Sequence, residues 1–354
     1  GAQNVAVGAL ALDSNTTANN NTAVGYQSLE QNTTGAANVA LGANAMDGNQ
    51  TGNSNTAVGY IALYENTTAG SNTAVGRSAL YANTTGNNNV SVGAYALDAN
   101  TTADNNVAIG YEALTTNTTG TQNAAIGYAA LEKNTTANNN TAVGYKALEE
   151  NTTGTQNTAL GANALDANTT SNNSTAIGFA NLSASTGASN TGTGSYCLNS
   201  NTSGTQNVAM GHAAMQFNTT GSSNTALGEA ALYSNTTASN NTAVGKNALD
   251  ANTTGTQNTA VGKDALGGNT TNSNNTAVGY AAMIAANGAT DCVAVGSEAL
   301  KSLTTGDYNV ALGFQALKSI TTASNNTAVG HEALENNTAA NNVAVGYEAL
   351  TANT

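Results

Sequence analysis

Apolar and polar residues follow a short pattern that repeats along the whole chain. A glycine follows a Thr-Ala-Val-like triplet twenty-one times, from Gly8 to Gly346; eighteen of the twenty intervals are 17 residues long and two are 16. One copy, residues 140–156, has the sequence NTAVGYKALEENTTGTQ, and we number coil positions one to seventeen from its first Asn. Because its two apolar runs are short and bounded by Gly and Asn, the pattern predicts short strands and turns.

A 17-residue unit cannot bury its apolar side chains alone, whereas stacked copies pair each backbone edge with the next coil. The sequence therefore predicts an all-β fold, a parallel β-solenoid of about 21 coils with like side chains stacked on like. No linker or change in composition interrupts the pattern, so we expect one domain over 1–354. The pattern also starts and stops without a distinct cap, which favours a fragment of a longer repeat protein.

The apolar positions differ in how much they vary between coils. Position four is aliphatic in twenty of twenty-one coils, position nine is Leu in eighteen and Met in three, and position two alternates mainly between Thr and Val. Such limited variation is typical of packed sites, and β-branched residues suit strands. We therefore predict that positions two, four and nine form the core.

Position twelve carries Asn in seventeen coils, but three consecutive coils have Ala286, Leu303 and Ile320 instead. Apolar replacements that occur as a stack indicate that this Asn points inward. The sequence predicts a buried asparagine ladder, in which each amide bonds turn backbone and the same Asn one coil away. Position one, Asn in nineteen coils, is a second candidate ladder. The predicted ladder comprises Asn15, Asn32, Asn66, Asn83, Asn100, Asn117, Asn134, Asn151 and Asn168.

Position three is Ala in nineteen coils. If its two neighbours face inward, strand alternation places it on the outside. A small outward residue at every coil would give a flat face for self-association; the alternative is that Ala only lines a tight turn. The predicted self-association face comprises Ala23, Ala57, Ala74, Ala108, Ala142, Ala243 and Ala277.

No catalytic group is evident, and we expect a non-enzymatic protein. His212 and His331 both lie at position six, which holds Tyr in seven coils and is otherwise mixed, as expected of a solvated face. Cys197 and Cys292 are six coils apart, about 29 Å at ~4.8 Å per coil, which is too far for a disulfide.

Charge narrows the choice of partners. The chain has seven Lys and Arg and a net charge of −13, which argues against nucleic acid, and no apolar run is long enough for a transmembrane helix. Acidic residues recur at position ten, as Asp13, Glu30, Asp47, Glu132, Glu149 and Asp166. They favour a solvated acidic stripe, with bridging calcium as the alternative, because calcium prefers oxygen ligands. No other cofactor is expected.

The Asn-Thr-Ala-Val-Gly-Tyr-x-Ala-Leu unit resembles the head repeats of trimeric autotransporter adhesins of the YadA-like kind and repeat regions of phage tail-fibre proteins. The matching stretches include residues 55–60 and 106–111. The resemblance implies a left-handed parallel β-roll that packs as a trimer at a cell surface. The coil here is longer than the usual head coil, and its Asn-Thr-Thr extension is not part of that pattern.

Three functions remain open. The first is an extracellular structural filament or surface fibre that assembles with copies of itself as a trimer or filament, on a cell or a virion. The second is an adhesive module, including a tail-fibre shaft, that binds glycans or matrix through the Tyr and acidic positions. The third is an ice-binding solenoid that uses files of Thr such as Thr118 and Thr119.

Overall fold

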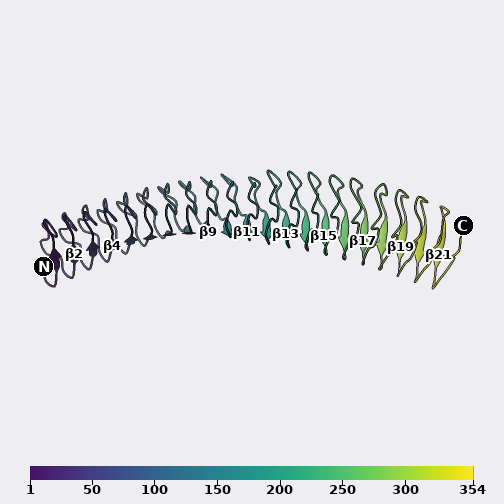
Figure 1. Cartoon of the computed structure of the whole chain (residues 1–354), viewed down its shortest axis with the longest axis horizontal. Coiled ribbons are helices and arrows are strands. Elements are labelled where there is room, and N and C mark those ends of the chain that lie inside the picture. Colours follow the sequence, from purple (N-terminus) through teal and green to yellow (C-terminus); the bar gives the residue numbers. More distant parts are fainter. Residues whose placement is uncertain (354) are drawn as a thin grey trace. The chain divides into compact units, whose positions relative to one another are not determined.

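The computed structural model describes residues 1–353, and these contain twenty-one strands of three residues each. The chain forms two compact units, Gly1–Ser174 and Thr175–Thr354. Each unit is a stack of similar coils with one strand in every coil (Figure 1). Within the described residues there is no helix long and apolar enough to cross a membrane. That residues 1–354 form a single domain stays a prediction.

The strands of the first unit are β1 (Val5–Val7), β2 (Thr22–Val24), β3 (Val39–Leu41), β4 (Thr56–Val58), β5 (Thr73–Val75), β6 (Val90–Val92), β7 (Val107–Ile109), β8 (Ala124–Ile126), β9 (Thr141–Val143) and β10 (Thr158–Leu160). Those of the second are β11 (Thr175–Ile177), β12 (Thr191–Thr193), β13 (Val208–Met210), β14 (Thr225–Leu227), β15 (Thr242–Val244), β16 (Thr259–Val261), β17 (Thr276–Val278), β18 (Val293–Val295), β19 (Val310–Leu312), β20 (Thr327–Val329) and β21 (Val343–Val345).

Neighbouring strands pair in parallel with like positions opposite each other. In β9 and β10, Ala142 pairs with Ala159 and Val143 with Leu160. The 16-residue coils keep this register, as Thr175 opposite Thr191 shows, because the missing residue falls in the loop between strands. The predicted all-β parallel solenoid with a 17-residue period is confirmed.

The turn after each strand depends on backbone conformations that few residues adopt. Gly144, at position five, has φ of 142°, and a Cβ there would lie 2.5 Å from the carbonyl oxygen of Gly161 in the next coil. Lys146 and Leu148, at positions seven and nine, have φ of 55° and 53°. A left-handed conformation costs an ordinary residue about 1–2 kcal/mol, so burial and inter-coil hydrogen bonds must offset it in every coil.

The core differs from the predicted one in part. Position nine is buried as predicted, for example Leu131, Leu148 and Leu165. Positions two and four, predicted to face inward, instead face outward: in most strands only the central residue is fully buried. Leu160 keeps 47% of its surface exposed and Met210 keeps 51%. The prediction failed because it assumed that aliphatic residues must mark the inside.

The predicted self-association face was also wrong. Ala23, Ala57, Ala74, Ala108, Ala142, Ala243 and Ala277 are all fully buried within their own coils.

Position three faces position eight across a narrow interior, which is the physical reason for its small side chain. Ser91, at position three, donates a hydrogen bond to the carbonyl of Ala96 at position eight, at 2.7 Å. A Cβ on Gly192 would overlap the side chain of Asn181, which occupies position eight of the neighbouring coil. Alanine therefore reflects lack of space inside the coil.

Candidate functional site

Two asparagine ladders run through the interior and hold the other surfaces in place. At position twelve, Asn151 Nδ2 donates to Asn134 Oδ1 of the preceding coil and to the carbonyl of Gly154, both at 3.0 Å. At position one, Asn140 Nδ2 donates to that same Gly154 carbonyl at 2.8 Å, and its Oδ1 accepts from the Asn157 amide at 2.9 Å. Both predicted ladders are confirmed, and they share an acceptor.

Ladder bonds at position twelve occur at every predicted coil of the first unit. Asn15 accepts from Asn32, and equivalent bonds link the later members. In the second unit the ladder is interrupted by Ala286, Leu303 and Ile320, all buried as predicted. The Oδ1 of Asn269, next to Ala286, is consequently buried without a hydrogen-bond partner.

The outward side chains at positions two and four of β1–β21 form what we call the outer strand face. Position four is aliphatic in twenty of the twenty-one strands, with Thr193 the exception, and position two is Thr in twelve strands, Val in eight and Ala in one. No residue at either position of these strands is charged. Val39, Leu41 and Ile126 each expose 39% or more of their surface. Each unit therefore presents an uncharged, largely aliphatic strip.

Sequence reasoning missed this face, although a usable signal was present. Position four varies in size from Val to Met, whereas position three is almost always Ala. Because packed interiors tolerate changes of volume poorly, the variable position was the better candidate for the outside.

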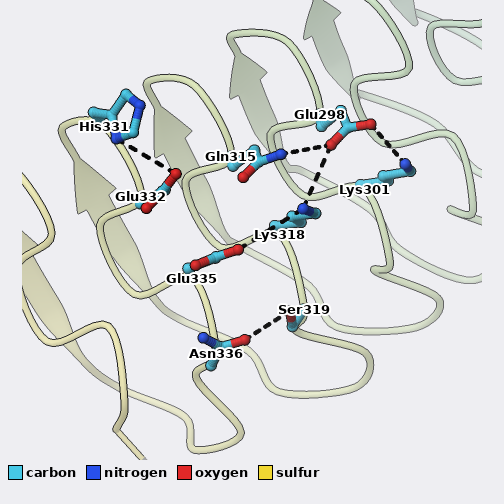
Figure 2. A network of polar contacts seen from close by, with 9 residues as sticks. All are labelled: Glu298, Lys301, Gln315, Lys318, Ser319, His331, Glu332, Glu335 and Asn336. Atoms are coloured by element: carbon cyan, nitrogen blue, oxygen red, sulfur yellow. Dashed lines mark hydrogen bonds and ion pairs between the residues drawn. The ribbon is translucent and has the colours of Figure 1, made fainter.

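Charged side chains lie on the turns and loops between the strands. In the second unit, Glu298 contacts Lys301 at 2.7 Å and Lys318 at 3.6 Å, and Lys318 also reaches Glu335 at 3.8 Å (Figure 2). The hydrogen bond from Lys301 lowers the pKa of Glu298. Such exposed pairs contribute little to stability, about 0–1 kcal/mol each.

The acidic positions fall into two local environments. Asp13 is exposed, but Asp47 is only 5% exposed, which corrects the prediction of a solvated stripe at that residue. Burial, with Glu30 as a further cause, raises the pKa of Asp47. Burial and then Glu149 likewise raise the pKa of Glu132, and burial raises that of Asp166 to about 6.

No three His, Cys, Asp or Glu side chains within residues 1–353 come together in a group that could hold a metal ion. Calcium at Asp13, Glu30, Asp47, Glu132, Glu149 and Asp166 stays a prediction.

The remaining candidates are dispersed. His212 and His331 are exposed, as predicted, and Cys197 and Cys292 are buried free thiols. Thr118 at position thirteen donates its hydroxyl to the carbonyl of Thr135 in the next coil at 3.1 Å, while Thr119 is exposed. Each pair thus contributes one outward Thr.

Six of the seven position-six tyrosines are about half exposed and Tyr347 is 72% exposed, as expected of a solvated face. No protein-family model matches the chain, and no curated protein is significantly similar to it in sequence.

Proposed function

We propose that this chain is a non-enzymatic structural repeat module of an extracellular filament or of a fibre on a cell or virion surface. It self-associates through the outer strand face. The observation that carries the proposal is the uncharged file of outward aliphatic side chains at position four, which a solvated sheet would not be expected to maintain.

A second copy of the chain is the occupant that fits this face best. A partner that contacts successive strands equivalently needs the same axial spacing of about 4.8 Å, and another copy has it. Three-residue strands give a strip about 10 Å wide, so ten or eleven coils present about 500 Å² in each unit. Two copies in contact through the strip of one unit would bury about 1,000 Å² in total, which is the lower bound for a specific interface.

Charge supports the same occupant. The chain carries a net charge of −13, which disfavours contact between copies over most of the surface. The outer strand face has no charged residue, so like-charge repulsion is weakest there. The resemblance to trimeric adhesin head repeats favours a trimer among the closed assemblies.

The two alternatives draw less support from the geometry. Tyr111, Tyr128 and Tyr145 stack on one another, which covers the ring faces inside the stack. The exposed Tyr26, Tyr60 and Tyr280 have no Tyr at position six of a neighbouring coil with which to form a row for a sugar chain. The Thr hydroxyls at position thirteen are engaged with the next coil, which leaves position fourteen as the outward Thr file of the loop, and the outward Thr at position two is replaced by Val or Ala in nine of the twenty-one strands.

Sedimentation velocity and native mass spectrometry of the full chain test the proposal. We expect the wild type to form a defined multimer, and Ile126→Lys with Leu160→Lys to shift it to monomer, because each places a charge on the outer strand face. The matched control is Thr136→Lys with Thr170→Lys, at exposed loop positions of the same two coils, which should leave the multimer intact.

Circular dichroism confirms that each variant is folded. A wild type that stays monomeric at every concentration, or a strand-face variant that remains multimeric, contradicts the proposal. Binding to a glycan array by a monomer would favour the adhesive alternative.

A further inference from the structure

Aromatic side chains in the first unit stack from coil to coil. Tyr111, Tyr128 and Tyr145 occupy position six of three consecutive coils, with ring centroids 5.6 and 5.3 Å apart and interplanar angles of 11° and 15°. Tyr64 and Tyr81, at position ten, are stacked at 5.4 Å with an angle of 2°. We call these the long and the short tyrosine stack.

The long stack is accessible from solvent. The three residues expose 44–51% of their surface, although the ring faces inside the stack are covered by the neighbouring ring. A small oxidant can therefore reach ring edges and hydroxyls. The rings sit on adjacent coils of a parallel, in-register sheet, so a reactive ring has its partner already in place; proximity of this kind replaces a bimolecular encounter with an intramolecular one.

We propose that the two tyrosine stacks are oxidative cross-linking sites, at which a haem peroxidase with hydrogen peroxide joins neighbouring coils through dityrosine bonds. Each phenol gives up one electron and one proton to become a phenoxyl radical, and two radicals couple through their ortho carbons. The hydrogen on each coupled carbon then moves as a proton to the phenolic oxygen. The pair has lost two electrons and two protons, which reduce one hydrogen peroxide to two waters.

Carboxylates near both stacks can receive the phenolic proton. The hydrogen bond to Glu112 raises the pKa of Tyr111. Burial, followed by the Asp47 carboxylate, raises the pKa of Tyr64. Both phenols therefore stay protonated at neutral pH, and oxidation at each is helped by a base already in contact with the stack.

Such bonds would link consecutive coils directly, where the covalent connection is otherwise only the backbone that runs 17 residues from one ring to the next. Each coil contacts only the coil before it and the coil after it, so the solenoid can open locally between two coils. A covalent bond between adjacent coils prevents that separation. This property suits a fibre, but the cross-linking geometry does not depend on the chain being one.

The full chain, treated at low protein concentration with peroxidase and hydrogen peroxide, tests the inference. We expect dityrosine fluorescence and a mass loss of two hydrogens per bond, with proteolytic peptides that join Tyr111 to Tyr128, Tyr128 to Tyr145, or Tyr64 to Tyr81. The yield per chain should not change on dilution, since coupling occurs within one chain.

Two variants separate stacking from mere exposure. Tyr128→Phe leaves Tyr111 and Tyr145 about 10 Å apart, two coil spacings, and should abolish both long-stack bonds. Tyr26→Phe is the control, because Tyr26 also occupies position six but is flanked there by Ala9 and Ala43. It should leave the yield unchanged.

Circular dichroism establishes that the variants fold. Cross-links found only between different chains, or none at the two stacks while other tyrosines react, would overturn the inference, as would undiminished long-stack bonding in Tyr128→Phe. Loss of self-association with normal cross-linking would defeat the proposed function alone.

Discussion

At the scale of single residues, the pairing of Asn181 with Gly192 shows how tightly the interior is filled. Asn181 replaces Ala at position eight, and its Nδ2 donates to the carbonyls of Ile177 at 3.2 Å and Gly194 at 2.9 Å. Gly192 replaces Ala at position three of the adjoining coil and makes room for the larger side chain. Two departures from the repeat thus compensate for each other.

Gly192→Ala alone should destabilise the protein by about 1–3 kcal/mol, because its Cβ overlaps Asn181. Asn181→Ala with Gly192→Ala restores the repeat and should recover most of that loss. Urea unfolding of the two single variants and the double variant gives the interaction free energy. A Gly192→Ala variant as stable as wild type would mean that the two positions do not face each other.

Asp166 is a second residue whose surroundings have a measurable consequence. Burial raises its pKa from 3.8 to about 6, and one of its carboxylate oxygens has no hydrogen-bond partner. The folded state therefore holds the proton more tightly than the unfolded state. Its contribution to stability is fully present below pH 3.8 and is lost as pH rises through about 6.

Asp166→Asn should leave stability near pH 3 unchanged and raise the free energy of unfolding at pH 8 by about 1 kcal/mol, a figure reduced for partial exposure. Urea unfolding across this pH range measures the effect. Asp13→Asn, in an exposed position, is the control. If the free energy of unfolding of Asp166→Asn depended on pH in the same way as that of the wild type, burial would not raise the pKa of Asp166.

At the scale of the coil, each element consists of one short strand, a turn with left-handed residues and a loop held by two asparagines. Three-residue strands are too short to be stable alone, and the left-handed Leu at position nine adds a cost. The two ladders offset this cost because each buried amide bonds both its own coil and a neighbour. The coil is thus an element only within a stack.

Asn151→Ala removes bonds to Asn134 and Gly154 and takes an acceptor from Asn168. Each buried hydrogen bond contributes about 1 kcal/mol, and polar atoms left unpaired cost more, so we expect the free energy of unfolding to fall by roughly 3 kcal/mol. Thermal and urea unfolding measure this change. Thr153→Ala, an exposed neighbour, should change stability by less than about 0.5 kcal/mol. If the two variants lowered the free energy of unfolding equally, the ladder would not be a source of stability.

At the scale of the whole molecule, the repeat gives the same surface to every coil within a unit. Charges lie on turns and loops, and the outer strand face has none. Since the net charge of −13 opposes association, the proposed multimer should strengthen as salt screens it. The interface itself, being aliphatic, should not weaken with salt, which sets it apart from an ion-paired interface.

The sequence by itself determined the solenoid, its period and both asparagine ladders, because a periodic pattern can bury its backbone edges in few ways. It also separated the exposed Tyr position from the buried Leu position. Which side of the strand faces inward was decided only by the tertiary structure. Because side chains alternate along a strand, either positions two and four or position three can face inward. The narrow space between positions three and eight admits Ala but not Val or Leu. The tertiary structure thereby buried the alanines and left the aliphatic residues outside.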